Sequence, residues 1–296
     1  MTRVGYIGLG MMGSAMVERL CAVDQLDEVW VHDLNEAAVD AAVALGARRA
    51  ASAAEVARRT HIVSVCVPAA EHVQAVLRGP AGLLEATQDT SGAPHASEVL
   101  IHSTVHPDTI TQARAGAAKH GLALFDASVA GGDDAARAGA LAIFAGGFDR
   151  MSPATQELLG LYGTKVIPAG PVGSGAALKL AVNVMTYSQF AAAAAAHSLV
   201  DGQGGDTEAL LAAWRHTGML GALTERFAAL LSIPPEHVTG GLRTMLDTQV
   251  GIARKDLSLA AELMPDDARA TLLTALTEAM ATTYGVAEPL GETPTP

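Results

Sequence analysis

The stretch that decides the fold lies near the N-terminus, where residues 4–13 are Val-Gly-Tyr-Ile-Gly-Leu-Gly-Met-Met-Gly. Val4 to Ile7 has the apolar run of a buried strand, and a helical pattern follows over 14–23. Between them stands G-x-G-x-x-G, whose glycines permit a tight turn, a close approach to a pyrophosphate, and packing of helix on strand. This context predicts a dinucleotide site. The predicted cofactor-binding residues of the loop are Gly8, Leu9, Gly10, Met11, Met12 and Gly13.

A second apolar strand, over 29–32, ends in Asp33, at the distance from the glycine loop where dinucleotide sites place an acidic residue. Such a carboxylate accepts hydrogen bonds from the adenosine ribose and repels a 2′-phosphate. Asp33 and its neighbour Leu34 are therefore predicted cofactor contacts, and the preferred cofactor is expected to be NAD. NADP stays the alternative, because four arginines can still fold towards the site: Arg48, Arg49, Arg58 and Arg59.

Strand and helix patterns alternate as far as about residue 170. Helices are expected over 36–45, 53–59, 71–77, 107–120 and 152–161, and strands over 47–50, 62–67, 99–102 and 122–126. Because these strands are nearly continuous apolar runs, they predict a parallel sheet covered on both faces, an α/β Rossmann-type doubly wound fold. A polar loop centred on 87–97 is expected to face solvent. A hairpin-like pair of strands, 141–147 and 165–167, is expected to close the domain.

In a sheet of this kind, ligands bind beyond the carboxyl ends of the strands. The turn at Val67 and Pro68 is therefore expected to border the cofactor. Ser103 and Thr104 follow the next strand, where their hydroxyls either reach the nicotinamide or cap the following helix. His102, just before them, either contacts a ligand or caps the same turn.

Two adjacent glycines, Gly131 and Gly132, follow the strand that ends near Asp126. Backbone N–H groups exposed at such a turn can hold a carboxylate without a charged side chain, although the same pair also suits a plain turn. The sequence therefore indicates an anion-binding turn, with a purely structural turn as the alternative.

From Gly175 onward only helical patterns remain, and the first of them contains Lys179 and Asn183. Four residues apart, these side chains lie one turn above each other on one helix face. A lysine in so apolar a run either extends to water or works in a pocket. The change of pattern predicts three parts: a NAD-binding domain over 1–170, a helical substrate and oligomerisation domain over 171–286, and a mobile tail over 287–296.

Composition excludes several classes of function. The chain has 296 residues and a formal net charge of −12, which argues against nucleic acid or an anionic membrane as the main partner and favours a small-molecule substrate. No metal-ligand spacing of Cys or His occurs, and Cys21 and Cys66 lie in apolar segments, as in a reducing compartment. No apolar stretch reaches transmembrane length without polar interruption, so a cytoplasmic location is expected.

Four motifs follow one another at set distances: G-L-G-x-M-G at 8–13, D-A-x-V-x-G-G at 126–132, G-x-G-x-x-x-K-x-x-x-N at 173–183, and Lys255-Asp256. Together they resemble the 3-hydroxyacid dehydrogenase family, which includes 3-hydroxyisobutyrate dehydrogenase and tartronate semialdehyde reductase, over nearly the whole chain. The resemblance implies a Rossmann-type domain, a helical domain that forms homodimers or homotetramers, and reversible NAD(P)-dependent oxidation of a small 3-hydroxy acid.

The same resemblance implies roles for single residues. Lys179 looks like the catalytic lysine, and Asn183 looks like the amide that holds substrate beside it. The positions implied for substrate binding are Ser128, Ala130, Gly131, Gly132 and Asp256. The positions implied for cofactor binding, besides the glycine loop and the strand ends, are Ser103, Thr104 and Lys255.

Several positions depart from the family pattern. Ala130 stands where serine is usual, Ser128 where proline is common, His102 where an aspartate is frequent, and Ala140 where a hydroxyl residue follows Gly139. The lysine and asparagine are kept while the substrate cradle is altered. The chemistry is therefore expected to be that of the family, with a less polar or differently charged substrate.

As a hypothesis, Lys179 removes the hydroxyl proton during oxidation and returns it during reduction, with its pKa lowered by burial and by the cationic nicotinamide. Asn183 would orient the oxygen. One alternative is an imine or enamine reductase on the same scaffold, but such relatives generally replace the lysine. The other is a non-catalytic NAD-responsive binding protein, and the intact pair of Lys179 and Asn183 argues against it.

Overall fold

A computed structural model describes residues 2–86 and 96–287. It divides into two compact units, Met1–Lys179 and Leu180–Pro296, called unit 1 and unit 2 below. The sequence places the division near residue 170, whereas the packing divides the chain inside a long helix that begins at Ser174. The solvent-facing loop predicted around 87–97 falls largely outside the described residues, as does the predicted tail after Ala287.

Unit 1 is built on one sheet, which in the described residues has eight strands in the order β3-β2-β1-β4-β5-β6-β7-β8. Neighbouring strands are parallel except for β6 and β7. The chain runs outward from β1 to β3 and then returns to β4 on the other side of β1. This reversal is the switch point at which doubly wound sheets bind ligands. The strands are β1 (Arg3–Ile7), β2 (Glu28–His32), β3 (Arg48–Arg49), β4 (Ile62–Val65), β5 (Glu98–Ile101), β6 (Ala123–Ala130), β7 (Leu141–Gly146) and β8 (Gly163–Gly170).

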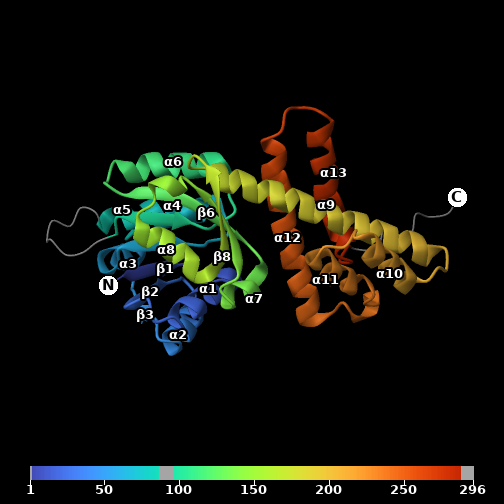
Figure 1. The fold of residues 1–296 in the computed structure, drawn as a ribbon, viewed down its shortest axis with the longest axis horizontal. Coiled ribbons are helices and arrows are strands. Elements are labelled where there is room, and N and C mark those ends of the chain that lie inside the picture. Colours follow the sequence, from blue (N-terminus) through green and yellow to red (C-terminus); the bar gives the residue numbers. More distant parts are fainter. Residues whose placement is uncertain (1, 87–95, 288–296) are drawn as a thin grey trace. The chain divides into compact units, whose positions relative to one another are not determined.

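The helices of unit 1 form two packed groups, drawn in Figure 1 around the sheet. In the first, α1 contacts α2, α7 and α8; in the second, α5 contacts α3 and α4, and α4 contacts α6. The predicted Rossmann-type fold is thereby confirmed. These helices are α1 (Met11–Cys21), α2 (Glu36–Ala44), α3 (Ala53–Arg59), α4 (Ala70–Arg78), α5 (Leu83–Ala86), α6 (Pro107–Ala118), α7 (Gly132–Arg137) and α8 (Pro153–Tyr162), with a short 3-10 helix η1 (Phe148–Arg150).

The predicted hairpin of the last two strands is wrong, because β7 and β8 are parallel. The ten-residue helix α8 lies between them, and parallel neighbours need such a crossover, whereas a hairpin joins antiparallel strands. The helix begins where Ser152 caps it by accepting from the N–H of Thr155, followed by Pro153 in the first turn. The antiparallel neighbour of β7 is instead β6.

The core of unit 1 comes from the apolar strands. All four residues of β4 are buried, and Val63 and Val65 are fully enclosed between the two helix layers. A strand buried on both faces reads as a continuous apolar run, which explains why the sequence pattern located it. The exception within this strand is Ser64, a polar residue that is also buried.

Unit 2 is helical in its described residues. The long helix α9 (Ser174–Gly202) contributes most of its length to this unit, and α12 and α13 lie side by side, as Figure 1 shows. Its core includes an aromatic cluster in which the rings of Phe190 and Phe227 stack at 4.1 Å and both meet Tyr284 edge-on. The other helices are α10 (Thr207–Thr217), α11 (Ala222–Leu231), η2 (Pro235–His237), α12 (Gly240–Glu262) and α13 (Ala268–Thr283).

Within residues 2–86 and 96–287, no helix is both long enough and apolar enough to cross a membrane.

Candidate active site

The glycine loop joins β1 to α1, and its three glycines have different surroundings. Gly8 has φ +95° and donates its N–H to the carbonyl of His32 at 3.1 Å. A Cβ on Gly13 would lie 1.9 Å from the carbonyl oxygen of Gly8, so only glycine fits there. A Cβ on Gly10 would meet nothing within 4 Å. The first and third glycines therefore close the turn, while the second leaves exposed backbone at the start of α1, which fits the approach of a pyrophosphate.

Asp33, at the end of β2, is bonded to the same loop. Its Oδ2 accepts the N–H of Leu9 at 2.5 Å, and its Oδ1 accepts the N–H of Asn35 at 2.7 Å. The carboxylate is partly exposed, and Leu34 beside it is 93% exposed. The acidic residue predicted to meet the ribose is thus bonded to the glycine loop through Leu9, while Asn35 holds its other oxygen locally.

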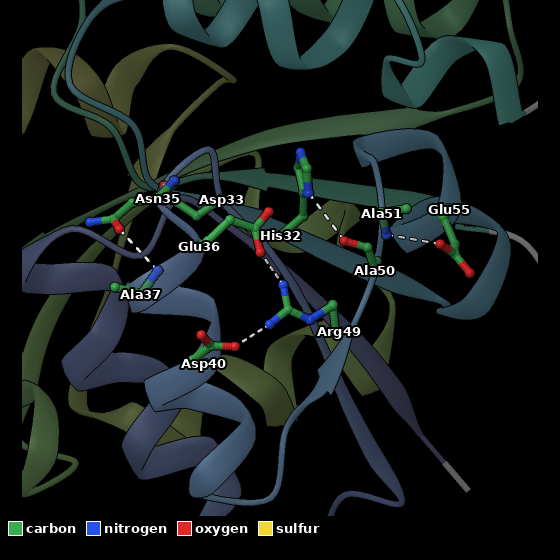
Figure 2. Close-up of polar contacts among 10 residues, drawn as sticks. All are labelled: His32, Asp33, Asn35, Glu36, Ala37, Asp40, Arg49, Ala50, Ala51 and Glu55. Carbon is green, nitrogen blue, oxygen red and sulfur yellow. Dashed lines mark hydrogen bonds and ion pairs between the residues drawn. The ribbon is translucent and has the colours of Figure 1, made fainter.

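Three of the four arginines considered for an NADP phosphate are paired with carboxylates. Arg49 bonds to Glu36 and Asp40 on α2, as Figure 2 shows. Arg48 pairs with Glu28 at 3.0 Å, and Arg59 pairs with Glu55 at 3.5 Å. Arg58 lies in the last turn of α3. The charges of the paired arginines are therefore engaged within unit 1.

The residues after β4 and β5 hold the two strand ends together. Ser103 is buried, and its Oγ accepts the N–H of Val67 at 2.8 Å. Its role as a helix cap is corrected, because His106 caps α6 by accepting the N–H of Asp108. Thr104 is half-buried at the same edge of the sheet, and Pro68 is exposed. The strand ends predicted to border the cofactor therefore lie together.

His102 is enclosed rather than turned to a ligand or to the following turn. It is 2% exposed, its Nδ1 lies 2.6 Å from the carbonyl oxygen of Ala127, and its Nε2 lies 3.3 Å from the hydroxyl of Tyr162. Its ring also stacks on Tyr6. Burial lowers the pKa of His102 to about 4, so the neutral ring donates from Nδ1 and accepts at Nε2.

This burial makes an acid-sensitive contact. His102 has an ordinary pKa near 6.5 when unfolded and about 4 when folded, so the unfolded chain binds more protons between these values. The free energy of unfolding is therefore highest above pH 6.5. It falls by up to about 3 kcal/mol as the pH drops towards 4, because protonation of this histidine then favours the unfolded chain. Urea titrations from pH 7 to pH 4 should show a flatter pH dependence for His102→Phe than for the natural protein. His72→Gln, at an exposed position of α4, is the control. Equal slopes for all three proteins would contradict the assignment.

The strand β6 extends beyond the end expected at Asp126, as far as Ala130. Ser128 is fully buried within it, and its hydroxyl has no hydrogen-bond partner among the described residues. Ala130 is half-buried at the strand end. Gly131 and Gly132 have φ values of +138° and +81° and are both exposed. Their backbone is therefore open to a ligand.

Asp126 was not singled out by the sequence, yet it joins β6 to the start of α9. It is fully buried, its Oδ1 accepts the N–H of Gly173 at 2.7 Å, and its Oδ2 accepts the N–H of Ala176 at 2.8 Å. Burial raises the pKa of Asp126, and these N–H donors act in the opposite direction. An aspartate inside an apolar strand pattern was the available signal, because strands are depleted in aspartate.

Lys179 and Asn183 both lie on α9, one turn apart. Lys179 is half-buried at the end of unit 1. Asn183, in unit 2, is 8% exposed and donates its Nδ2 to Oδ2 of Asp256 at 2.6 Å. The helix therefore keeps the predicted pair on one face, and a buried carboxylate fixes the amide.

Asp256, predicted to bind substrate, is enclosed in unit 2. Its side chain is 1% exposed, Lys255 Nζ lies 2.8 Å from its Oδ1, and the hydroxyl of Tyr187 donates to its Oδ2 at 3.5 Å. Burial and the nearby Asp256 raise the pKa of Tyr187, so this hydroxyl stays a donor. In this structure Asp256 therefore contacts Asn183, Lys255 and Tyr187.

Metal chemistry gains no support from the part of the chain that the structure describes, since no group of three or more His, Cys, Asp or Glu side chains lies close enough to hold an ion. Cys21 and Cys66 are free thiols, and burial raises the pKa of Cys66 to about 11. Neither cysteine has the lowered pKa of a reactive thiol.

Comparison with known proteins gives a consistent result. Residues 3–170 match the NAD binding domain of 6-phosphogluconate dehydrogenase. An uncharacterised oxidoreductase of Mycobacterium tuberculosis is 35% identical over 88% of this chain and 85% of its own. The 3-hydroxyisobutyrate dehydrogenase of Pseudomonas aeruginosa is 34% identical over 62% of this chain and 59% of its own. A 3-hydroxyisobutyrate dehydrogenase of Mycobacterium tuberculosis, solved with L-serine, shares the fold with a TM-score of 0.75 over 97% of this chain and 96% of its own, at 23% identity.

Proposed function

Because the chain belongs to the 3-hydroxyacid dehydrogenase family, we propose that it transfers a hydride reversibly between NAD and a small 3-hydroxy acid, similar to 3-hydroxyisobutyrate, or its semialdehyde. The chain is an oxidoreductase that uses a nicotinamide cofactor. The proposal concerns the substrate class, the preference for NAD and the residues that act.

One observation carries the proposal: the start of the Lys179 helix is bonded at the edge of the sheet where the strand ends gather. Asp126, which holds that start, pairs with Ile101, the last residue of β5. The glycine loop follows β1, and Gly131 follows β6, beyond the same edge. The glycine loop, the turn at Gly131 and Gly132 and the start of α9 therefore lie on one side of unit 1, and this arrangement supports their proposed roles in a dehydrogenase.

Lys179 is the proposed acid/base. The nicotinamide, when bound, supplies the hydride acceptor, and a proton must leave the substrate hydroxyl in the same reaction. The neutral amine of a half-buried lysine can accept that proton at Nζ, and the ammonium so formed can return it in the reverse reaction, while Asn183 one turn away can hold the oxygen. The bond from Asn183 to Asp256 fixes the amide in one orientation, which supports this positioning role.

The exposed backbone at Gly131 and Gly132 is proposed to hold the acid group of the substrate. The positive φ values of both residues are strained for any residue with a side chain, so the turn is reserved for glycine. Ala130 supplies no hydroxyl beside this turn, and Ser128 is buried within β6. We therefore expect a substrate with fewer polar groups next to its carboxylate than a family member with serine at residue 130 would take.

A spectrophotometric screen tests this proposal. The natural protein would be incubated with NAD or NADP and a panel of 3-hydroxy acids, and with the reduced cofactors and the matching semialdehydes, while absorbance of the reduced nicotinamide is followed. Turnover of a 3-hydroxy acid supports the proposal. Reduction of cyclic imines without turnover of any hydroxy acid would favour an imine reductase. Cofactor binding without any turnover would favour an NAD-responsive binding protein.

The preference for NAD rests on Asp33 and on the pairing of the nearby arginines. We expect Asp33→Ser to weaken NADH binding and to narrow the preference for NADH over NADPH by roughly 10-fold to 100-fold, since one charge-assisted contact is lost and one repulsion removed. Glu157→Gln, at an exposed position of α8, is the control and should leave the preference unchanged. Fluorescence titration of both reduced cofactors measures the ratio. An unchanged ratio for Asp33→Ser would count against the assignment.

Self-association and a cytoplasmic location stay predictions. Exposed apolar side chains on α9 in unit 2, Met185 and Leu199, support a homodimer or homotetramer. Sedimentation equilibrium of the purified chain measures the assembly directly, and a monomer at micromolar concentration would contradict it.

A further inference from the structure

A buried carboxylate connects the two segments on which the proposed chemistry depends. Asp126 lies in β6, five residues before Gly131, and its two oxygens accept the N–H groups of Gly173 and Ala176 at the start of α9. The donors lie 47 and 50 residues away along the chain. The first N–H groups of a helix have no partner within the helix, so a side chain from another element satisfies them here.

The packing around this carboxylate leaves no room for side chains on two neighbouring glycines. A Cβ on Gly146 of β7 would lie 2.1 Å from Asp126 Oδ1. A Cβ on Gly175 of α9 would lie 2.8 Å from Oδ2 and 2.3 Å from the carbonyl oxygen of Phe144. Strand and helix therefore approach the carboxylate at glycines from two sides. These residues, Asp126, Gly146, Gly173, Gly175 and Ala176, are called the Asp126 junction below.

The junction bears on Lys179 because α9 is a rigid rod from its first turn. Lys179 lies three residues beyond Ala176, less than one turn along the helix. The position of its ammonium therefore depends on where the first turn is held. The same strand that holds this turn continues to Gly131, whose exposed backbone is the proposed anchor of the substrate acid group.

We propose that Asp126 is a positioning residue: it holds the start of α9 against β6 so that Lys179 stands in register with the acid-group turn at Gly131 and Gly132. The inference rests on the proposed function of Lys179. Asp126 touches neither substrate nor cofactor in this scheme, and it acts through the helix.

The test variant is Asp126→Asn, which keeps the volume but turns an amide NH₂ towards a backbone N–H. The matched control is Glu98→Gln. Glu98 is also a buried carboxylate in unit 1, and it holds the start of α8 by accepting from the N–H and the hydroxyl of Ser152. The two variants therefore make the same chemical change at two helix starts, of which one carries Lys179.

The expected results separate positioning from folding. Asp126→Asn should keep NADH affinity and lower kcat by roughly 100-fold with KM changed little, since small misplacements of reacting groups have effects of that size. Glu98→Gln should keep kcat within a few-fold. In a Lys179→Ala background, Asp126→Asn should reduce kcat no further, because both changes remove the same contribution. Equal kcat for the two single variants, or full additivity with Lys179→Ala, would overturn the proposal.

Amide hydrogen exchange gives a readout independent of turnover. Asp126→Asn should speed exchange in peptides covering 173–180 and leave those covering 153–162 unchanged, and Glu98→Gln should do the reverse. Unchanged exchange at 173–180 overturns the proposal even where activity falls. If no substrate is found, the proposed function fails while exchange still decides whether Asp126 holds α9. If Asp126→Asn does not fold, Asp126→Ser takes its place. Exchange of the Gly173 and Ala176 N–H groups is then also measured in the natural protein, and rapid exchange of both groups would overturn the proposal.

Discussion

Lys179→Ala is expected to bind NADH as the natural protein does and to lose roughly 1,000-fold in kcat, within the range that general acid/base groups contribute. The side chain leaves from α9, outside the loop after β1 that is proposed to hold the dinucleotide. Alanine also has the highest helix propensity, so the helix should persist. Steady-state rates on the substrate found by screening, together with NADH titration, measure both quantities.

A second variant separates proton transfer from simple attraction of charge. Lys179→Arg keeps the positive charge, but a guanidinium does not release its proton at working pH, so its kcat should stay low. Lys165→Ala, at an exposed position of β8, is the control and should be fully active. Near-normal turnover of Lys179→Ala would remove Lys179 from the mechanism. High activity of Lys179→Arg would show that charge is sufficient.

The parts of the fold that sequence patterns predicted are those with local signals. The strand before Gly8, the acidic residue after β2 and the buried run of β4 each follow from a few adjacent residues whose spacing has a physical cause. The glycine loop is the clearest case, because the positive φ of Gly8 and the crowding at Gly13 are properties of the turn itself. The all-helical character of the chain after Gly175 follows equally from the end of strand patterns.

The features that sequence patterns missed depend on contacts between distant segments. The bonds from Asp126 to α9 span 47 and 50 residues, and the carbonyl that His102 meets lies 25 residues away. Whether a histidine at a strand end faces a ligand or the interior is decided by which strand packs next to it. The enclosure of Asp256 likewise follows from Asn183 and Tyr187 on another helix. The parallel pairing of β7 and β8 has the same origin, since the strand pattern alone does not fix direction.

The altered positions divide into two groups when their surroundings are compared. His102 and Ser128 are enclosed within unit 1, so their difference from the family pattern changes packing: His102 supplies a bond to β6 and a stacking partner for Tyr6. Ala130 stands next to the exposed pair of glycines, so we expect its missing hydroxyl to affect what the proposed acid-group turn binds. Substrate selectivity should therefore respond to substitution at residue 130 more than at residues 102 or 128.

The glycine loop allows a prediction that distinguishes binding from folding at two neighbouring glycines. Gly13→Ala places a methyl group 1.9 Å from the carbonyl oxygen of Gly8, so the turn must open, and we expect a loss of about 3 kcal/mol or more in the free energy of unfolding. Gly10→Ala meets nothing within 4 Å, and its backbone, with φ −64° and ψ −174°, suits alanine. This variant should fold normally.

The methyl group of Gly10→Ala nevertheless stands where the pyrophosphate is expected to approach the start of α1, so NADH affinity should fall roughly 100-fold, equivalent to about 3 kcal/mol. Gly160→Ala, in the interior of α8 and also free of contacts within 4 Å, is the matched control. It should lower neither the NADH affinity nor the free energy of unfolding. Urea unfolding and NADH titration of the three variants give the comparison. Neither substitution crowds the protein, so on packing alone Gly10→Ala and Gly160→Ala should behave alike. If the two differ in NADH affinity but not in the free energy of unfolding, the difference comes from contact with the dinucleotide. Equal affinities would mean that the cofactor does not approach the chain at Gly10.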